Sequence, residues 1–276
     1  MAKGIASLSL AYYLTSEDKY ARKAVENLRV WFIDAKTRMN PNMNFGQTIP
    51  GHNNGKGRGE GLIDTYSFVE MLEGVELLKR SSSFTQADRK ALKEWFVSFL
   101  DWMQTSEVAR EEYEAKNNHG TAFDIQVVRY ALFVGKEELA LQFINEFPAR
   151  RLFKQIEPDG SQPLELARTK AFGYSVFNLS HFLDMCKMAK SLNVDLYGAR
   201  SSDGRSIAKA IDFLLPFAGK TTAEFPYKQI ADWDKVMKDF WWVLYRANQF
   251  VPNSEYKRLY EKSQISNDFN INNLLY

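Results

Sequence analysis

Asn118 and His119 stand side by side where a polar turn leads into an apolar segment, and both side chains can donate hydrogen bonds to an anion. The pattern predicts that a helix begins at this point. Backbone N–H groups are unpaired at a helix N-terminus and the local field is positive, which favours a bound negative charge. Asn118 could alternatively be only an N-cap, because asparagine is among the best capping residues.

A second set of polar side chains lies on a predicted helix over residues 165–191. Tyr174, Asn178 and His181 recur at the spacing of one helix face, and Arg168 precedes them. The opposite stripe is apolar and consists of Phe172, Val176, Leu179, Leu183 and Cys186. We expect the apolar stripe to pack on the scaffold and the polar stripe to face a cleft. The alternative is that the polar residues are hydrogen-bonded groups of the core.

A long irregular stretch between Arg38 and Glu60 alternates glycine with polar and basic residues. Loops of this length in a compact domain usually have a function or are disordered. The glycine spacing matches neither a phosphate loop nor a dinucleotide fingerprint. We expect the glycines to let the backbone approach a ligand. The substrate-binding candidates here are His52, Asn54, Lys56 and Arg58.

Metal and thiol chemistry are poorly supported by the sequence. His52, His119 and His181 are the only histidines, and no two of them have the spacing of a zinc site. Cys186 is the only cysteine and lies in an apolar segment, which predicts a buried, unreactive thiol. We therefore expect neither a metal nor a cofactor.

Paired carboxylates leave a second chemistry open. An acid and a base for glycoside hydrolysis could come from Glu60, Asp64, Asp124, Glu157, Asp159 and Glu165. The sequence does not give the distances between these groups.

The composition limits the class of protein. The chain has 276 residues, 45% of them hydrophobic, and a formal net charge of +2. This charge argues against a nucleic-acid partner, and no apolar run approaches the roughly 20 residues needed to span a bilayer. No charged-then-apolar signal peptide opens the chain.

Helical periodicity recurs along almost the whole chain. Helices are predicted near residues 2–15, 18–38, 60–80, 86–105, 120–134, 137–146, 165–191, 204–217, 232–250 and 254–262. The segment 86–105 has an apolar face of Leu92, Trp95, Phe96, Phe99 and Met103 and a charged face that begins with Asp88, so we expect an outer helix whose charged face is solvated. Helices in successive antiparallel pairs form either an open solenoid or a closed α/α toroid. No fixed repeat period is present, which disfavours a regular solenoid. We expect an all-α chain forming an incomplete α/α toroid, with residues 1–276 as one catalytic domain that lacks an N-terminal segment.

The runs NNHGTAFDIQ at 117–126 and ELARTKAFGYS at 165–175, with Asn178-Leu179, resemble the alginate lyase family of polysaccharide lyases. The resemblance extends from about Ala2 to Tyr245. It implies an incomplete α/α toroid with a deep cleft that cuts acidic polysaccharides by β-elimination without a metal. It also implies that Asn118 and His119 bind the uronate carboxylate and that Tyr174 moves protons.

The chemistry explains why such residue types are needed. A proton on carbon 5 of a uronate is hard to remove while the adjacent carboxylate is charged, so neutralising that carboxylate is the main electrostatic task. Tyr174 serves as base and acid if the proton and the leaving oxygen lie on one side of the sugar; otherwise His119 is the base. A tyrosine that acts as a base needs a nearby cation, for which Arg168 is the first candidate and Lys170 the second.

These observations lead to three hypotheses. The first is a lyase acting on a uronate polymer, with alginate leading; the others are a toroid glycoside hydrolase and a non-catalytic glycan-binding helical protein. His181 and Trp241 are further substrate-binding candidates, although a core role is the favoured interpretation of Trp241. The family's usual export suggests a periplasmic or secreted location. The sequence does not determine the oligomeric state.

Overall fold

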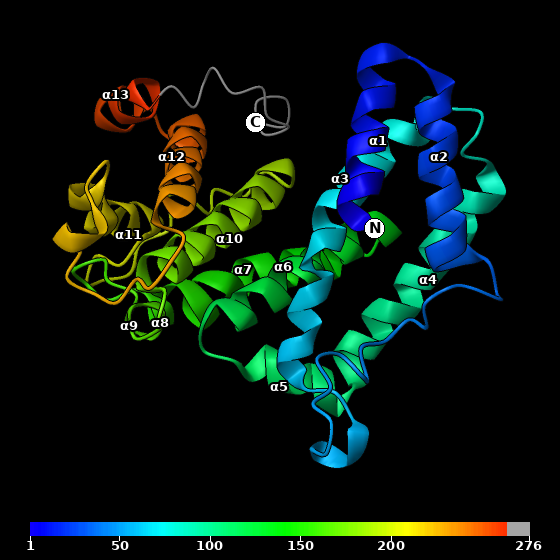
Figure 1. The fold of residues 1–276 in the computed structure, drawn as a ribbon, viewed down its shortest axis with the longest axis horizontal. Helices are drawn as coiled ribbons and strands as arrows, with labels where there is room; N and C mark the ends of the chain where they lie inside the picture. The colour runs from blue at the N-terminus through cyan, green and yellow to red at the C-terminus, as the bar shows by residue number, and fades with distance from the viewer. Residues whose placement is uncertain (264–276) are drawn as a thin grey trace. The chain divides into compact units, whose positions relative to one another are not determined.

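The computed structural model describes residues 1–263, and within them the ordered elements are helices. The only extended pairing described there is an isolated antiparallel bridge between Lys170 and Gln229. The α-helices, shown in Figure 1, are α1 (Ala2–Thr15), α2 (Asp18–Leu28), α3 (Ser67–Leu77), α4 (Gln86–Thr105), α5 (Glu107–Glu114), α6 (Asn118–Val134), α7 (Glu137–Phe147), α8 (Phe153–Gln155), α9 (Pro163–Leu166), α10 (Ala171–Ser191), α11 (Ile207–Leu214), α12 (Trp233–Phe250) and α13 (Ser254–Lys262). The all-α prediction is confirmed.

Two predicted helices are shorter than the periodicity suggested. The helix expected over 18–38 ends with a π-helical turn at Arg29–Ile33. The helix expected over 165–191 is broken between α9 and α10, so the prediction of one continuous helix was wrong. The break has a tertiary cause, because a distant segment pairs with the backbone there: Thr169 O accepts the N–H of Ile230 at 3.1 Å.

The described chain divides into two compact units. The first comprises Met1–Ala115 with Ala122–Phe143, and the second comprises Lys116–Thr121 with the chain from Ile144 onward. The proposal of one catalytic domain over residues 1–276 stays a prediction.

Aromatic side chains form the core of the first unit. Trp95 and Phe99 on α4 stack with ring centroids 5.1 Å apart, and Phe32 meets Trp95 edge-on at 4.8 Å. Edge-to-face and offset pairs stabilise a core beyond the area that they bury. The apolar stripe predicted for residues 86–105 is confirmed, since its members Leu92, Trp95, Phe96, Phe99 and Met103 are all buried.

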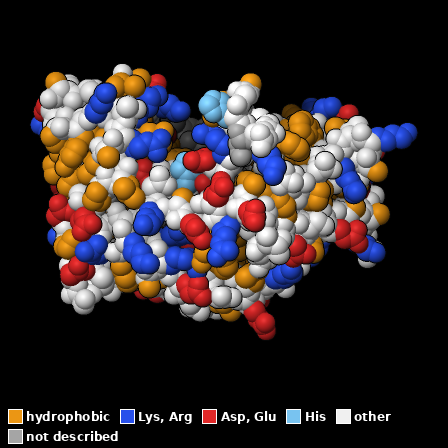
Figure 2. All heavy atoms as spheres, turned by 90° about the horizontal axis from the view of Figure 1, so that it is seen from below, with side chains coloured by type: hydrophobic (Ala, Val, Ile, Leu, Met, Phe, Trp, Pro, Cys, Tyr) orange, Lys and Arg blue, Asp and Glu red, His pale blue; other side chains and the backbone are white. Residues whose placement is uncertain are grey.

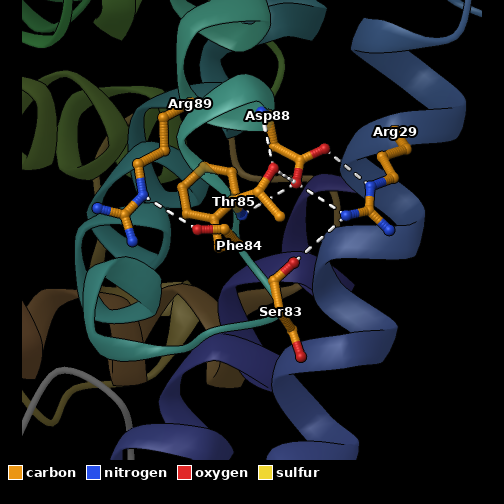
Figure 3. Close-up of polar contacts among 6 residues, drawn as sticks. All are labelled: Arg29, Ser83, Phe84, Thr85, Asp88 and Arg89. Atoms are coloured by element: carbon orange, nitrogen blue, oxygen red, sulfur yellow. Dashed lines mark hydrogen bonds and ion pairs between the residues drawn. The ribbon is translucent and has the colours of Figure 1, made fainter.

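The start of α4 departs from the expected polar face. Thr85 and Asp88 form a reciprocal capping box, and Arg29 donates from Nε and Nη2 to the Asp88 carboxylate at 2.8 Å each (Figure 3). The Arg29 hydrogen bond is the main reason that the pKa of Asp88 falls to about 2, against the opposing effect of burial. Asp88, predicted to be solvated, is instead a buried link between the end of α2 and the start of α4.

In the second unit, α10 packs against α12. Phe172 on α10 meets Phe240 on α12 edge-on at 5.5 Å, and Phe147 meets Phe182 at 6.0 Å. The apolar stripe predicted for α10 is buried, including the free thiol of Cys186, as expected. The core of this unit therefore fixes α10, which carries Tyr174.

Candidate active site

Arg168 lies over the ring of Tyr174 in the second unit. Its guanidinium carbon is 4.0 Å from the ring centroid, and both side chains are half-buried. Arg168 was expected on the same helix as Tyr174, but it belongs to the turn between α9 and α10. The chain therefore folds back to place a cation against the face of the ring, in the geometry of a cation–π contact.

A distant segment holds the helix start that carries Tyr174. The first N–H groups of α10 lack helical partners, as at any helix start. Lys228 O accepts the N–H of Ala171 at 2.9 Å, and Gln229 Oε1 accepts that of Gly173 at 3.2 Å. These bonds fix α10 one turn from Tyr174.

Lys170, a candidate for substrate binding and for the cation beside Tyr174, is paired with Asp232. The hydrogen bond from Lys170 lowers the pKa of the Asp232 carboxyl. The charge of the Lys170 ammonium is therefore partly neutralised within the protein, whereas the Arg168 guanidinium lies over the Tyr174 ring. Which of the two cations acts on Tyr174 during the reaction stays a prediction.

Asn118 is the first residue of α6, and its contacts differ from those of a simple N-cap. Asn117 performs the capping, because its Oδ1 accepts the N–H of His119 at 3.2 Å. Glu165 Oε1 accepts the Asn118 N–H at 2.7 Å, and Glu165 Oε2 accepts from Asn118 Nδ2 at 2.8 Å. The anion at this helix N-terminus is thus a carboxylate of the protein itself.

Burial governs the charge of this carboxylate. Glu165 is 1% exposed, and desolvation raises its pKa, while the two hydrogen bonds from Asn118 and the nearby Arg168 and His119 act in the opposite direction. Asn118 is also 1% exposed, whereas His119 is half-buried. Of this adjacent pair, His119 is the side chain more open to a ligand.

A buried amide network ties the Asn118 turn to α10. Asn178 Nδ2 donates to Gln155 Oε1 and Gln162 Oε1, both at 2.8 Å. Gln155 Nε2 donates in turn to Asn117 O at 3.2 Å, and Thr121 donates to Gln155 at 3.0 Å. Asn178 was expected to face a cleft, but it is fully buried and serves this network.

His181 lies behind the same turn. Burial is the main reason that its pKa falls to about 4, and a hydrogen bond with the backbone of Asn118 acts in the opposite direction, as does the charge of Asp184. The side chain is therefore neutral near pH 7 and is almost fully buried. The structure brings His181 close to Asn118 and His119, in a position that supports them, and its contact with substrate stays a prediction.

The loop candidates belong to the first unit. His52, Asn54 and Lys56 are exposed, while Arg58 is half-buried and donates to Gln47 Oε1 at 2.8 Å. Their role in substrate binding stays a prediction.

The glycines of this loop have a structural reason that the sequence did not suggest. A Cβ at Gly57 would lie 2.5 Å from Gly46 N, and one at Gly61 would lie 2.4 Å from Gly46 C. These glycines allow the loop to pack on its own backbone. Close approach to a ligand is not needed to explain them.

Trp241 on α12 is half-buried, with its ring 6.1 Å from that of Phe240. This position fits both a sugar-stacking and a core role.

Within the second unit, the carboxylates proposed for hydrolysis have internal partners: Glu165 binds Asn118, and Glu157 forms an ion pair with Arg205 at 3.3 Å. Both oxygens of Glu165 are occupied, which disfavours it as a hydrolytic acid or base.

Sequence reasoning missed the grip of Glu165 on Asn118 and the roles of Gln155, Gln162 and Gln229. No spacing signal links these glutamines to the site, because their partners are distant in sequence.

Among residues 1–263 no group of histidine, cysteine or carboxylate side chains could hold a metal ion. No described helix is long and apolar enough to cross a membrane. Acidic and basic side chains are interspersed over the face shown in Figure 2, with no large area of one sign.

Comparison with known proteins supports the resemblance seen in the motifs. The sequence pattern of the Alginate lyase family matches residues 1–225. The structure is similar to that of an alginate lyase from Bacteroides ovatus, with a TM-score of 0.94 and 53% sequence identity over 95% of this chain and 69% of that one. This similarity also bears out the predicted α/α-toroid fold class. A comparison with curated proteins gave no match. The chain therefore belongs to the alginate lyase family of polysaccharide lyases.

Proposed function

We propose that this enzyme cleaves a uronate polymer, alginate first, by β-elimination and leaves a 4,5-unsaturated uronate at the new non-reducing end. The observation that carries the proposal is the Arg168 guanidinium placed 4.0 Å from the ring centroid of Tyr174. A cation at this position can stabilise the negative charge that develops in the transition state of proton transfer. The acidic polysaccharide is the partner, and no metal or cofactor takes part in the proposed steps.

The substrate carboxylate is the first group that the site has to stabilise. We propose that His119 meets it directly, because His119 is half-buried, and that the second amide proton of Asn118 supports it from behind. Hydrogen-bond donors are most effective where water is excluded, and removing one such donor in other enzymes slows turnover on the order of 100- to 1000-fold.

Proton transfer completes the reaction. The C5–H bond breaks, its electron pair forms the C4–C5 double bond, and the C4–O4 bond breaks as the leaving oxygen takes a proton. Tyr174 accepts the first proton and donates to the leaving oxygen when both lie on one side of the sugar. Mannuronate and guluronate are epimers at carbon 5, so for one of them the proton lies on the other side and His119 is the base.

Ultraviolet absorbance tests this scheme, because elimination creates a double bond conjugated to the carboxylate whereas hydrolysis creates none. The substrates are mannuronate-rich alginate, guluronate-rich alginate and glucuronan. Tyr174→Phe is expected to lower kcat on the order of 100- to 10,000-fold, the usual contribution of general acid–base catalysis. Tyr197→Phe is the matched control, because Tyr197 lies in the same unit and stacks on Phe250 at 5.3 Å.

The outcomes separate the three hypotheses. Absorbance that rises with the native enzyme and Tyr197→Phe but not with Tyr174→Phe supports elimination and identifies the polymer. New reducing ends without absorbance would favour a hydrolase, and binding without either would favour a glycan-binding protein. A periplasmic or secreted location, as the family resemblance suggests, is part of this proposal.

A further inference from the structure

Glu165 contacts the first residue of α6 through both carboxylate oxygens. One oxygen accepts the backbone N–H of Asn118 at 2.7 Å and the other accepts its side-chain N–H at 2.8 Å. An ionised carboxylate only accepts hydrogen bonds, so it selects the nitrogen end of the Asn118 amide. The amide is therefore held in one of its two possible orientations.

This orientation decides what the amide can offer to a ligand. The nitrogen carries two protons, of which Glu165 takes one, while the oxygen can only accept. Asn118 Oδ1 is buried and has no hydrogen-bond partner among the described residues. If the amide rotated by 180°, its oxygen would take the position of the nitrogen. The substrate carboxylate would then meet an oxygen instead of the second amide proton and would be repelled.

Glu165 also belongs to the segment that carries Arg168. The N–H of Arg168 bonds to Glu165 O at 3.1 Å, and the Arg168 guanidinium lies over Tyr174. The segment 165–168 thus binds Asn118 through the Glu165 side chain and contacts the ring of Tyr174 through the Arg168 side chain. It joins the part of the site that binds the carboxylate to the part that moves protons.

We propose that Glu165 is a positioning residue of the lyase site: it fixes which end of the Asn118 amide faces the substrate carboxylate and holds the backbone next to His119. The inference rests on the proposed function, because it presumes that Asn118 supports a uronate carboxylate. It assigns Glu165 no direct contact with substrate.

Glu165→Gln separates orientation from fold. In this variant the glutamine oxygen still accepts the backbone N–H of Asn118. Its nitrogen can donate to Asn118 Oδ1 once the amide has rotated, so both hydrogen bonds remain and only the orientation changes. We expect kcat to fall about 10- to 100-fold, the scale on which small misplacements slow enzymes, with a smaller change in KM and little change in Tm.

A double-mutant cycle shows whether Glu165 acts through Asn118. Kinetics are compared for the native enzyme, Glu165→Gln, Asn118→Ala and the double variant, since residues in one network give non-additive effects. We expect the double variant to be no slower than Asn118→Ala alone. Asp88→Asn is the matched control, because Asp88 is also a buried carboxylate at a helix start but lies in the other unit. Its kcat is expected to be unchanged below its unfolding temperature.

The native enzyme and the variants answer different questions. If the native enzyme forms no unsaturated product from any uronate polymer, the proposed function fails and this inference fails with it. If the native enzyme is active and Glu165→Gln keeps its full kcat, the proposed function stands and the role of Glu165 is refuted. Losses that simply add in the double variant would also refute a role exerted through Asn118.

Discussion

Replacing Arg168 tests the contact on which the proposed mechanism depends most. The guanidinium carbon lies 4.0 Å from the Tyr174 ring centroid, within the range of a cation–π interaction. Such contacts contribute about 0.5 to 2 kcal/mol, and each 1.4 kcal/mol or so corresponds to about tenfold in rate. Because a negatively charged ring attracts a cation more strongly, the contact strengthens as Tyr174 loses its proton, and only such interactions speed the chemical step.

Two substitutions separate the charge from the planar stack. Arg168→Lys keeps the positive charge but loses the planar group, and we expect kcat to fall about tenfold, the middle of the cation–π range. Arg168→Met also loses the charge, and we expect a loss on the order of 100-fold, as for other electrostatic contacts to a transition state. Initial rates of ultraviolet absorbance on the preferred alginate measure both values.

The control is Arg258→Lys on α13, whose side chain is mostly exposed and forms only a loose ion pair with Glu255 at 3.9 Å. Its kcat is expected to stay unchanged. Native kinetics in Arg168→Lys and Arg168→Met would refute the reasoning. The reasoning would also be refuted if the fall in kcat of either variant were fully explained by a lower fraction of folded protein, as measured by Tm.

Two further predictions concern stability and helix capping. Asp88→Asn removes a carboxyl whose pKa is lowered to about 2 from 3.8, mainly by the hydrogen bond of Arg29. The ionised carboxylate stabilises the folded protein above about pH 4, and this contribution to the free energy of unfolding disappears as the pH falls toward 2. The pKa shift sets an upper limit of about 2.5 kcal/mol, which the exposure of Arg29 reduces to about 1 kcal/mol. Urea unfolding at pH 7 and pH 2.5 measures it, and an equal difference from the native protein at both values would contradict the assignment. Gln229→Ala removes the acceptor for the Gly173 N–H, so we expect about 1 kcal/mol of lost stability and a lower kcat. Asn253→Ala is the control, because it removes the cap of α13. It should lower stability by a similar amount and leave kcat unchanged. Equal kcat in these two variants would argue against Gln229 as a support for the helix start that carries Tyr174.

The sequence was informative where local chemistry dominates. The spacing of Trp95, Phe96 and Phe99 predicted which side of α4 would be buried, because a helix places such residues on one stripe wherever it packs. The polar turn before Asn118 predicted the start of α6 for a similar reason. The motifs around Asn118 and Tyr174 also indicated the family, which the comparisons confirm.

Contacts between distant residues were not predictable in the same way. The break before α10 arises from pairing with Lys228 and Gln229, and nothing in the local periodicity signals that pairing. Asp88 looked solvated because its neighbours in sequence are charged, but Arg29 meets it from another helix. In each case the energy comes from a partner far along the chain.

The sequence by itself determined that the chain is helical, which helix stripes are apolar, and where the chemically capable residues occur. Those properties follow from backbone geometry and from the intrinsic polarity of each side chain. Only the tertiary structure decided that Glu165 occupies the positive end of α6 and that Arg168 covers Tyr174 from a turn. Hydrogen bonds and ring contacts act over a few ångströms, so they depend on which distant segments folding brings together, and a one-dimensional pattern does not contain that information.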